Sequence, residues 1–183
     1  MLDLVKKLAE RFGVSLKTEQ CYSHQLPFAD NYFDIVYAAN LFHHVDLKKS
    51  LFEVKRVLKP GGLLVSWDPL IHNPLINVYR RMAMGVRTED EHPLAMKDLK
   101  VFKSQFIEVD YQMTWFFTLW IFLKFYFIDR INPNQDRYWK KILTDHKKLE
   151  KIYLFLEKID NWVLRILPFL RRYCWNITIF AKK

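Results

Sequence analysis

Two adjacent histidines, His43 and His44, directly follow an apolar segment that is typical of a β-strand. Imidazole is the usual general base near neutral pH, so this pair could remove a proton from a bound hydroxyl group. Asp68 and His72 follow a second apolar segment and could face the same substrate. We take His44 and Asp68 as the candidate catalytic residues. For His43 the pattern favours a structural role, capping or packing against the next helix, and for Asp68 and His72 an ordinary cap or loop role stays open.

Two loops could hold a ligand, because ligands of open α/β sheets bind beyond the carboxyl ends of the strands. Ala39 and Asn40 end the first apolar segment, and the small side chain of alanine lets a ligand approach the backbone. The loop before that segment carries Tyr22, Ser23 and His24. The alternative is that both loops are mere connections. No group of His, Cys and Asp has metal-ligand spacing, so the sequence predicts no metal.

A strand–helix–strand unit must position these residues. Residues 33–40 are almost continuously apolar, as in a strand covered on both faces. Residues 46–58 form an amphipathic helix with Asp46 as its N-cap, and residues 59–62 (Lys-Pro-Gly-Gly) stop it, with Gly61 suited to a left-handed conformation. Residues 63–67 form a second buried strand. The other expected elements are a helix over 2–12, strands over 15–20, 106–116 and 173–181, partly helical structure over 71–103, and a long helix over 136–167.

Composition narrows the class of protein. The chain of 183 residues has only 4 glycines, none in a G-x-G arrangement, which excludes a glycine-rich phosphate-binding loop. Two cysteines are too few for a disulfide framework and indicate a reduced, intracellular setting. The net charge of +9 is uneven: residues 1–70 contribute nine cations against eight anions, or +1, and residues 71–183 twenty against twelve, or +8.

Residues 26–45 (LPFADNYFDIVYAANLFHHV) and 53–65 (EVKRVLKPGGLLV) resemble the middle of a class I S-adenosylmethionine-dependent methyltransferase, closest to the small-molecule and quinone or lipid group. The resemblance continues loosely over residues 73–94. It implies S-adenosylmethionine as cofactor, with the adenine against Tyr22, Ser23 and His24 and the methionine part against Ala39 and Asn40. The family often has an acidic residue where Tyr22 stands.

The resemblance also implies an N-terminally truncated chain. In the family, the cofactor lies on a glycine-rich turn after the first strand, and an acidic residue ending the second strand holds its ribose. Neither feature is present, and the opening residues look like the helix after that second strand. We therefore expect an α/β fold: a Rossmann-like methyltransferase sheet lacking its first strand–helix–strand unit. Residues 15–20 would then pair with residues 33–38, or the sheet would keep an open edge.

Residues 115–172 form an unusually long insertion before the last strand, rich in aromatic and basic residues. We expect one domain over 1–183, with a Rossmann-like part (1–114), this helical insertion (115–172) and a terminal strand (173–183). The aromatic residues of the insertion could form core beneath a helical lid, or they could face an anionic membrane surface. The second interpretation uses the aromatic residues Trp115, Trp120, Phe122, Phe125 and Phe127, with Lys140, Lys141, Lys147, Lys148 and Lys151 on the polar side.

The function that follows is methyl transfer to a small-molecule or lipid-like acceptor by an incomplete chain of such an enzyme. The alternatives are a non-catalytic methyltransferase-like remnant and a peripheral membrane-binding module. The longest apolar run, residues 115–128, is too short to span a bilayer, so we expect a cytoplasmic protein, peripheral to the inner face of the membrane if the basic surface binds lipid. The basic charge also fits nucleic acid, but no nucleic-acid-binding motif supports that partner. The sequence does not predict an oligomeric state.

Overall fold

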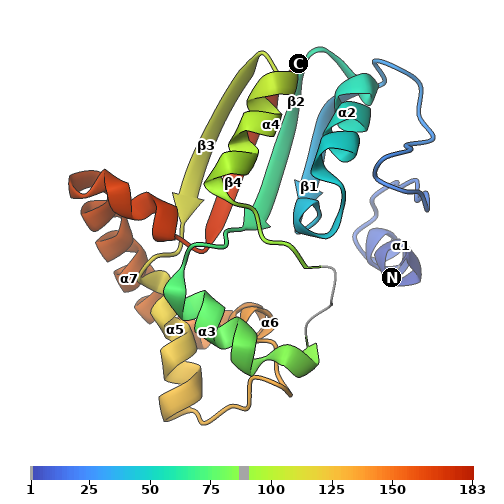
Figure 1. Ribbon diagram of the computed structural model, residues 1–183. Helices are drawn as coiled ribbons and strands as arrows, with labels where there is room; N and C mark the ends of the chain where they lie inside the picture. The colour runs from blue at the N-terminus through green and yellow to red at the C-terminus, as the bar shows by residue number, and fades with distance from the viewer. Residues whose placement is uncertain (1, 87–90) are drawn as a thin grey trace.

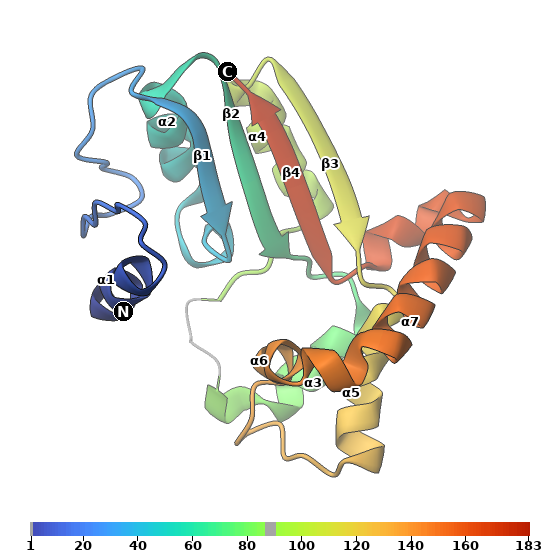
Figure 2. The same cartoon turned by 180° about the vertical axis from the view of Figure 1, so that it is seen from behind.

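A computed structural model describes residues 2–86 and 91–183 (Figure 1). Met1 and residues 87–90, which belong to the loosely resembling stretch 73–94, lie outside the described residues. The chain forms a four-stranded sheet with helices on one face and a helical extension at one end of the strands (Figures 1 and 2). Helix α1 (Leu2–Arg11) lies to the side of the sheet, and Gly13 follows it with a positive φ of 63°.

The strand–helix–strand unit is as predicted. Strand β1 (Phe33–Ala39) leads through the 3-10 turn η1 (Phe42–His44) into α2 (Leu47–Val57), and β2 (Leu58–Pro69) returns parallel to β1. Asp46 caps α2, accepting a hydrogen bond from the Lys49 amide at 3.1 Å. Strand β2 starts earlier than expected, because the Lys-Pro-Gly-Gly segment belongs to this strand and does not form a loop before it. Gly61 has the left-handed φ of 76° that its position predicted.

The two remaining strands complete the sheet in the order β1-β2-β4-β3. Strand β4 (Asn176–Lys182) lies between β2 and β3 (Glu108–Thr114) and is antiparallel to both. Helix α4 (Leu99–Gln105) follows the short turns η2 (Met84–Val86) and η3 (Met96–Asp98) and leads into β3. Strand β4, although it comes last in the chain, is therefore an inner strand of the sheet.

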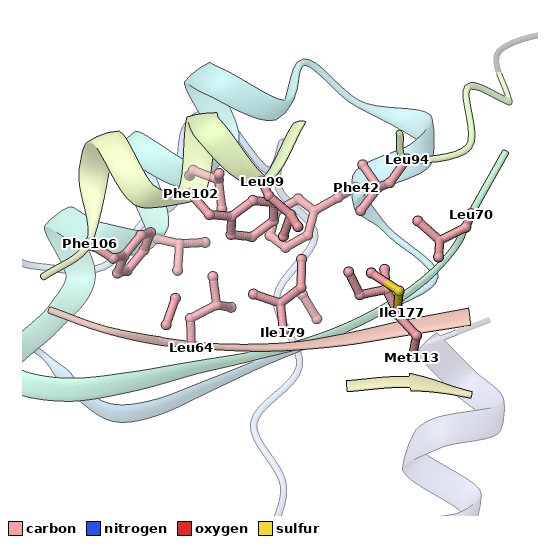
Figure 3. Close-up of a cluster of buried hydrophobic side chains, with 14 of the residues drawn as sticks. Phe42, Leu64, Leu70, Leu94, Leu99, Phe102, Phe106, Met113, Ile177 and Ile179 are labelled. Atoms are coloured by element: carbon pink, nitrogen blue, oxygen red, sulfur yellow. The ribbon is translucent and has the colours of Figure 1, made fainter. Parts of the chain in front are cut away.

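The main core lies between the sheet and helices α2 and α4 (Figure 3). Alternate residues of β2 and β4, such as Leu64 and Ile179, point to this face and are almost fully buried, since successive strand side chains alternate between faces. Phe102 of α4 packs edge-to-face on Phe42 of η1, with ring centroids 5.8 Å apart. This contact fixes η1, the turn that carries both candidate histidines, onto the core.

The opposite face of the sheet is not covered by any helix of the described residues (Figure 2). Ile35 and Tyr37 of β1 are 63% and 68% exposed there, so the expectation of a strand covered on both faces is wrong for β1. The predicted strand over residues 15–20 is wrong as well, since this segment has no regular structure. Of the two outcomes the sequence left open, the structure has the open edge at β1.

The helical extension runs from β3 to β4. It contains η4 (Thr118–Trp120), α5 (Ile121–Leu123), the π-helical η5 (Lys124–Ile128), α6 (Tyr138–Thr144), α7 (His146–Ile166) and η6 (Pro168–Tyr173), and it packs against α3 (Pro74–Met82). The single helix expected over 136–167 is divided at Asp145, which has a non-helical ψ of 15°.

Several aromatic residues of the extension form a second core. Phe122 and Phe125 are buried, and Trp115 packs against the same cluster, so the expectation that these three face a membrane is wrong. Trp120 and Phe127 are exposed as expected. The reason is that α3, from the Rossmann-like part, supplies an apolar surface that the sequence of the insertion alone does not show.

Asp160 joins the two ends of the extension. Its buried carboxylate accepts hydrogen bonds from the amides of Phe116, Phe117 and Thr118, at 3.1, 2.6 and 3.2 Å, and from the Thr118 hydroxyl at 2.7 Å. These amides begin the extension just after β3, whereas Asp160 lies in α7. One side chain therefore fixes α7 to the end of the sheet.

We expect Asp160→Ala to lower the free energy of unfolding by about 3 kcal/mol, because three amides in or near the core lose their acceptor. Asn161→Ala, at the exposed neighbouring position of α7, is the matched control and should have little effect. Chemical denaturation of both variants measures the difference. Equal stabilities for the two would show that solvent replaces the carboxylate without cost.

The open edge of β1 predicts self-association, because an unpaired apolar strand is a template for pairing with another chain. Placing lysine at Ile35 and Tyr37 should reduce the association, since charged side chains protect sheet edges. Phe52→Lys, at an exposed position of α2, is the control. Sedimentation velocity measures the outcome, and a wild-type chain that is a monodisperse monomer would contradict the prediction.

Candidate functional site

The parallel strands β1 and β2 end at the same edge of the sheet, and a cavity of about 360 Å³ lies beyond their carboxyl ends. Asn40, directly after β1, lines it and has a left-handed φ of 52°. The Asn40 amide donates a 2.7 Å hydrogen bond to the Trp67 carbonyl of β2, which holds the two strand ends together. The cavity is therefore where ligands of open α/β sheets bind.

His43 and Asp68 form a buried pair beside this cavity. The His43 ring lines the cavity, and its Nδ1 lies 2.8 Å from Asp68 Oδ1. Both side chains are almost inaccessible, at 4% and 0% exposure for the two residues. Burial raises the pKa of Asp68, and the hydrogen bond with His43 opposes that rise. With Asp68 ionised, Nδ1 carries the proton and donates it, so the lone pair of the ring lies on Nε2, the atom that can act as a base.

The structure brings both histidines to the cavity, and His43, not the candidate base His44, makes the contact with Asp68. His43, which was expected to be structural, holds the contact with Asp68. The His44 ring is tilted by 40° against the His43 ring, with ring centroids 4.0 Å apart, and His44 also lines the cavity. Asp68 lies behind His43 and is fully buried, so it orients that ring from the side away from the cavity. His72 is exposed and accepts a 3.4 Å hydrogen bond from the Met96 amide.

The loop proposed for the adenine lies against α2. Ser23 Oγ is 2.8 Å from Ser50 Oγ, and the rings of Tyr22 and His24 stack with centroids 5.4 Å apart. His24 lines a different hollow, beside the outer surface of α2. The structure thus brings Asn40 and His44 to one cavity, but it does not bring Tyr22, Ser23 and His24 into that cavity. Ala39 precedes Asn40 as the last residue of β1.

Arg56 of α2 holds this loop in place. Its guanidinium donates to the Leu26 and Phe28 carbonyls, at 2.9 and 2.7 Å, and pairs with Asp30 and Glu53. Glu53 also accepts a 2.9 Å hydrogen bond from the Leu26 amide. The guanidinium lowers the pKa of Glu53, so this carboxylate stays ionised. The loop is therefore fastened to the helix through its backbone.

Sequence reasoning missed most of the cavity wall. Four aromatic side chains, each from a different element or segment of the chain, line the cavity: Trp67, Tyr79, Trp139 and Trp175. Trp139 and Trp175 belong to α6 and to the segment before β4, so only the folding of the extension brings them to the strand ends. Their aromatic character was visible in the sequence, but nothing local indicated that they share a cavity with His43.

Charged groups also line the cavity. Arg80, Arg137 and Glu91 contribute, and Arg80 donates to the Leu70 carbonyl and to Asn77 Oδ1. Possible ligand atoms of His43, His44 and Glu91 lie within 4.8 Å of one another, a grouping that sequence spacing could not predict. Arg80 and Arg137 line the same cavity, and their positive charge disfavours a bound cation, so we assign no metal to this group.

Comparison with known proteins agrees with this architecture. Residues 1–66 match a family model described as "Methyltransferase domain". The chain is 49% identical over 70 residues to the uncharacterised protein YafE of Escherichia coli, covering 37% of this chain and 34% of YafE. It is 42% identical over 65 residues to the ubiquinone/menaquinone biosynthesis C-methyltransferase UbiE of Paraburkholderia phymatum, covering 32% of this chain and 27% of UbiE.

Longer matches extend over the insertion. An uncharacterised protein of Methanocaldococcus jannaschii is 30% identical over 161 residues, covering 83% of this chain and 62% of the relative. This chain therefore spans from 27% to 62% of the length of these relatives. The crystal structure of an S-adenosylmethionine-dependent methyltransferase from Methanosarcina mazei has the same fold, with a TM-score of 0.56 at 16% identity, covering 99% of this chain and 76% of that one. The chain thus resembles the methyltransferase domain family over residues 1–66 and has the Rossmann-like fold of S-adenosylmethionine-dependent methyltransferases.

Proposed function

We propose that this chain forms the acceptor-binding part of a methyltransferase that uses S-adenosylmethionine to methylate a small-molecule or lipid-like acceptor. The observation that supports this proposal is the buried His43–Asp68 pair at the cavity beyond β1 and β2. A buried carboxylate behind a histidine that lines a cavity is the arrangement expected of a general base. In this proposal His43 is the base and Asp68 is its positioning residue.

The end of β1 fits the sulfonium part of S-adenosylmethionine. Ala39 has a small side chain, and the left-handed backbone of Asn40 turns the chain at the cavity. We assign the methionine part to these two residues and the adenine to the loop of Tyr22, Ser23 and His24. When bound, S-adenosylmethionine supplies a methyl group on a positively charged sulfur. The four glycines form no G-x-G turn, so this chain has only part of the usual binding surface.

His43 would accept the acceptor's proton on Nε2 while Asp68 holds the Nδ1 proton. The electrons of the broken O–H bond would stay on the acceptor and make its oxygen, or a conjugated ring carbon, nucleophilic. Bound S-adenosylmethionine would supply the methyl group, its methyl–sulfur bond breaking to leave neutral S-adenosylhomocysteine, and methylation at a ring carbon would also release the proton of that carbon. Asp68 stabilises the imidazolium that forms, because a carboxylate beside a buried cation lowers its free energy. Aligning the two reactants in the cavity contributes the remaining acceleration.

The cavity wall favours a planar aromatic acceptor. Trp67, Tyr79, Trp139 and Trp175 offer aromatic surface on several sides, and aromatic rings pair well in offset or edge-to-face contacts. The likeness to UbiE, named as a ubiquinone/menaquinone C-methyltransferase, supports a phenol or quinol as one such acceptor. Removal of its hydroxyl proton would make the ring carbon beside it nucleophilic.

A non-catalytic role is the second candidate, because the chain lacks the glycine turn that binds the cofactor in the family it resembles. In that case the cavity would bind a ligand without methylating it, or the chain would serve as a partner subunit. The two candidates differ in one measurable property, which is methyl transfer when the concentration of S-adenosylmethionine is not limiting.

We expect S-adenosylmethionine to bind this chain weakly, since the strand-end contacts of Ala39 and Asn40 act without a glycine turn or a ribose-binding carboxylate. Isothermal titration measures the dissociation constant. A value in the low micromolar range would mean that the present residues suffice, and the proposal of a partial cofactor site would be wrong.

For methyl transfer, we expect turnover of a short-chain naphthoquinol when radiolabelled S-adenosylmethionine is raised to millimolar concentration. His43→Gln should lower kcat by about 10²–10⁴-fold, because it removes the base. His72→Gln, at an exposed histidine outside the cavity, is the matched control. A greater loss in His44→Gln than in His43→Gln would assign the base to His44, and no transfer by a wild-type chain that binds the quinol would favour the non-catalytic role.

A further inference from the structure

Helix α7 carries an exposed apolar surface that the fold does not use. Phe155 and Trp162 are 63% and 67% exposed, and Ile152 and Ile166 are also exposed. Phe169, just beyond the helix in η6, is 61% exposed. Phe155, Trp162 and Phe169 are seven residues apart, as are Ile152, Ile159 and Ile166. Seven residues are almost two helical turns, so within α7 the isoleucines form one row and Phe155 and Trp162 an adjacent one. We call these six residues the α7 stripe.

Apart from the half-buried Ile159, the residues of the stripe are exposed, and all but Phe169 lie on a helix that is firmly packed. Leu149 and Leu164 on another face of α7 are buried, and Asp160 makes the four hydrogen bonds described above. Figures 1 and 2 show α7 at the periphery of the molecule, beside the β3 edge of the sheet. The apolar surface is therefore a property of the folded protein and does not arise from a detached helix.

A row of cations lies beside the stripe. Lys151, Lys158 and Arg165 each precede one of the three isoleucines and repeat at the same seven-residue spacing. All three are exposed, and none belongs to an ion pair between described residues. On the helical period, the aromatic row lies between the isoleucine row and this cationic row. Glu150 and Glu157 lie farther round the helix, on the side of the cationic row away from the stripe.

From this arrangement we infer that α7 is a membrane-docking face whose partner is an anionic lipid bilayer. Aromatic and aliphatic side chains enter the headgroup region when a helix lies in the plane of the interface, and flanking cations bind anionic headgroups. Tryptophan is suited to that boundary, because its ring is apolar and its N–H group remains hydrogen-bonded. No helix in the described part of the chain is long and apolar enough to cross a bilayer, so the contact is with the surface.

The seven-residue spacing also suits packing of two helices, so a second copy of the chain is the rival partner. The charges favour the bilayer, because the charged residues beside the stripe are all positive and the glutamates lie away from it. A second copy would therefore offer no acidic row to pair with these cations. This inference deepens the proposed function by naming a surface through which a lipid-like acceptor would be reached, but lipid binding itself requires no methyl transfer.

The test is co-sedimentation of the full chain with vesicles of phosphatidylcholine alone or mixed with phosphatidylglycerol. We expect strong preference for the anionic vesicles, weakening as salt screens the charges. Replacing Lys151, Lys158 and Arg165 by glutamine should weaken that binding about 100-fold, at about 1 kcal/mol for each cation. The matched control replaces Lys97, Lys100 and Lys103, which are exposed around α4, and should bind as the wild type.

Replacing Phe155 and Trp162 by serine should weaken binding to anionic vesicles at least tenfold, whereas Phe52→Ser on α2 should not. Circular dichroism checks that each variant is folded, and the glutamine variant, with only exposed changes, serves if the serine variant unfolds. Equal and negligible binding to both vesicles would overturn the inference. So would stripe variants that bind lipid like the wild type, or that convert a dimer into a monomer without altering lipid binding. Methyl transfer with no lipid binding would refute the docking face and leave the proposed function standing.

Discussion

The parallel pairing of β1 and β2 is the constraint on which the candidate site depends. Parallel strands joined by a helix end at the same edge of the sheet, so the residues that follow them meet although they are far apart in the chain. His43 follows β1 and Asp68 belongs to the end of β2, and their 2.8 Å contact results from this shared edge. The Asn40 amide bonded to the Trp67 carbonyl extends the pairing by one residue and keeps the edge closed. A change of register would separate all of these groups.

The helical extension completes the cavity, and it depends on the antiparallel half of the sheet. Strands β3 and β4 are the two ends of the segment that contains the extension, so their pairing brings its beginning and end together. Asp160 then closes the base of the extension with four hydrogen bonds. Burial of Phe122 and Phe125 against α3 places α6 so that Trp139 lines the cavity. The extension thus serves the site through packing, while its outer helix keeps an apolar stripe free.

The sheet is covered on one face only within the described residues, and this determines the character of its edge strand. Val36 of β1 packs on the core side, whereas Ile35 and Tyr37 point to the open side. Apolar side chains on an uncovered face contribute little to stability, since they remain in contact with water. The well-packed part of the molecule is accordingly the layer between α2, α4 and the inner strands, which is where the histidine turn η1 is fixed.

The sequence by itself determined the local elements and the residue types of the site. The apolar segments, the Asp46 cap and the left-handed Gly61 are encoded by neighbouring residues, so they were predictable. The predicted strand–helix–strand order along the chain also indicated that the residues at the ends of the two strands, Asn40, His43 and Asp68, lie at one edge of the sheet. Only the tertiary structure decided which histidine contacts Asp68, which aromatic residues are buried and which line the cavity. Those outcomes depend on contacts between segments dozens of residues apart, such as α3 with the extension, and local patterns carry no information about which apolar surface will cover another.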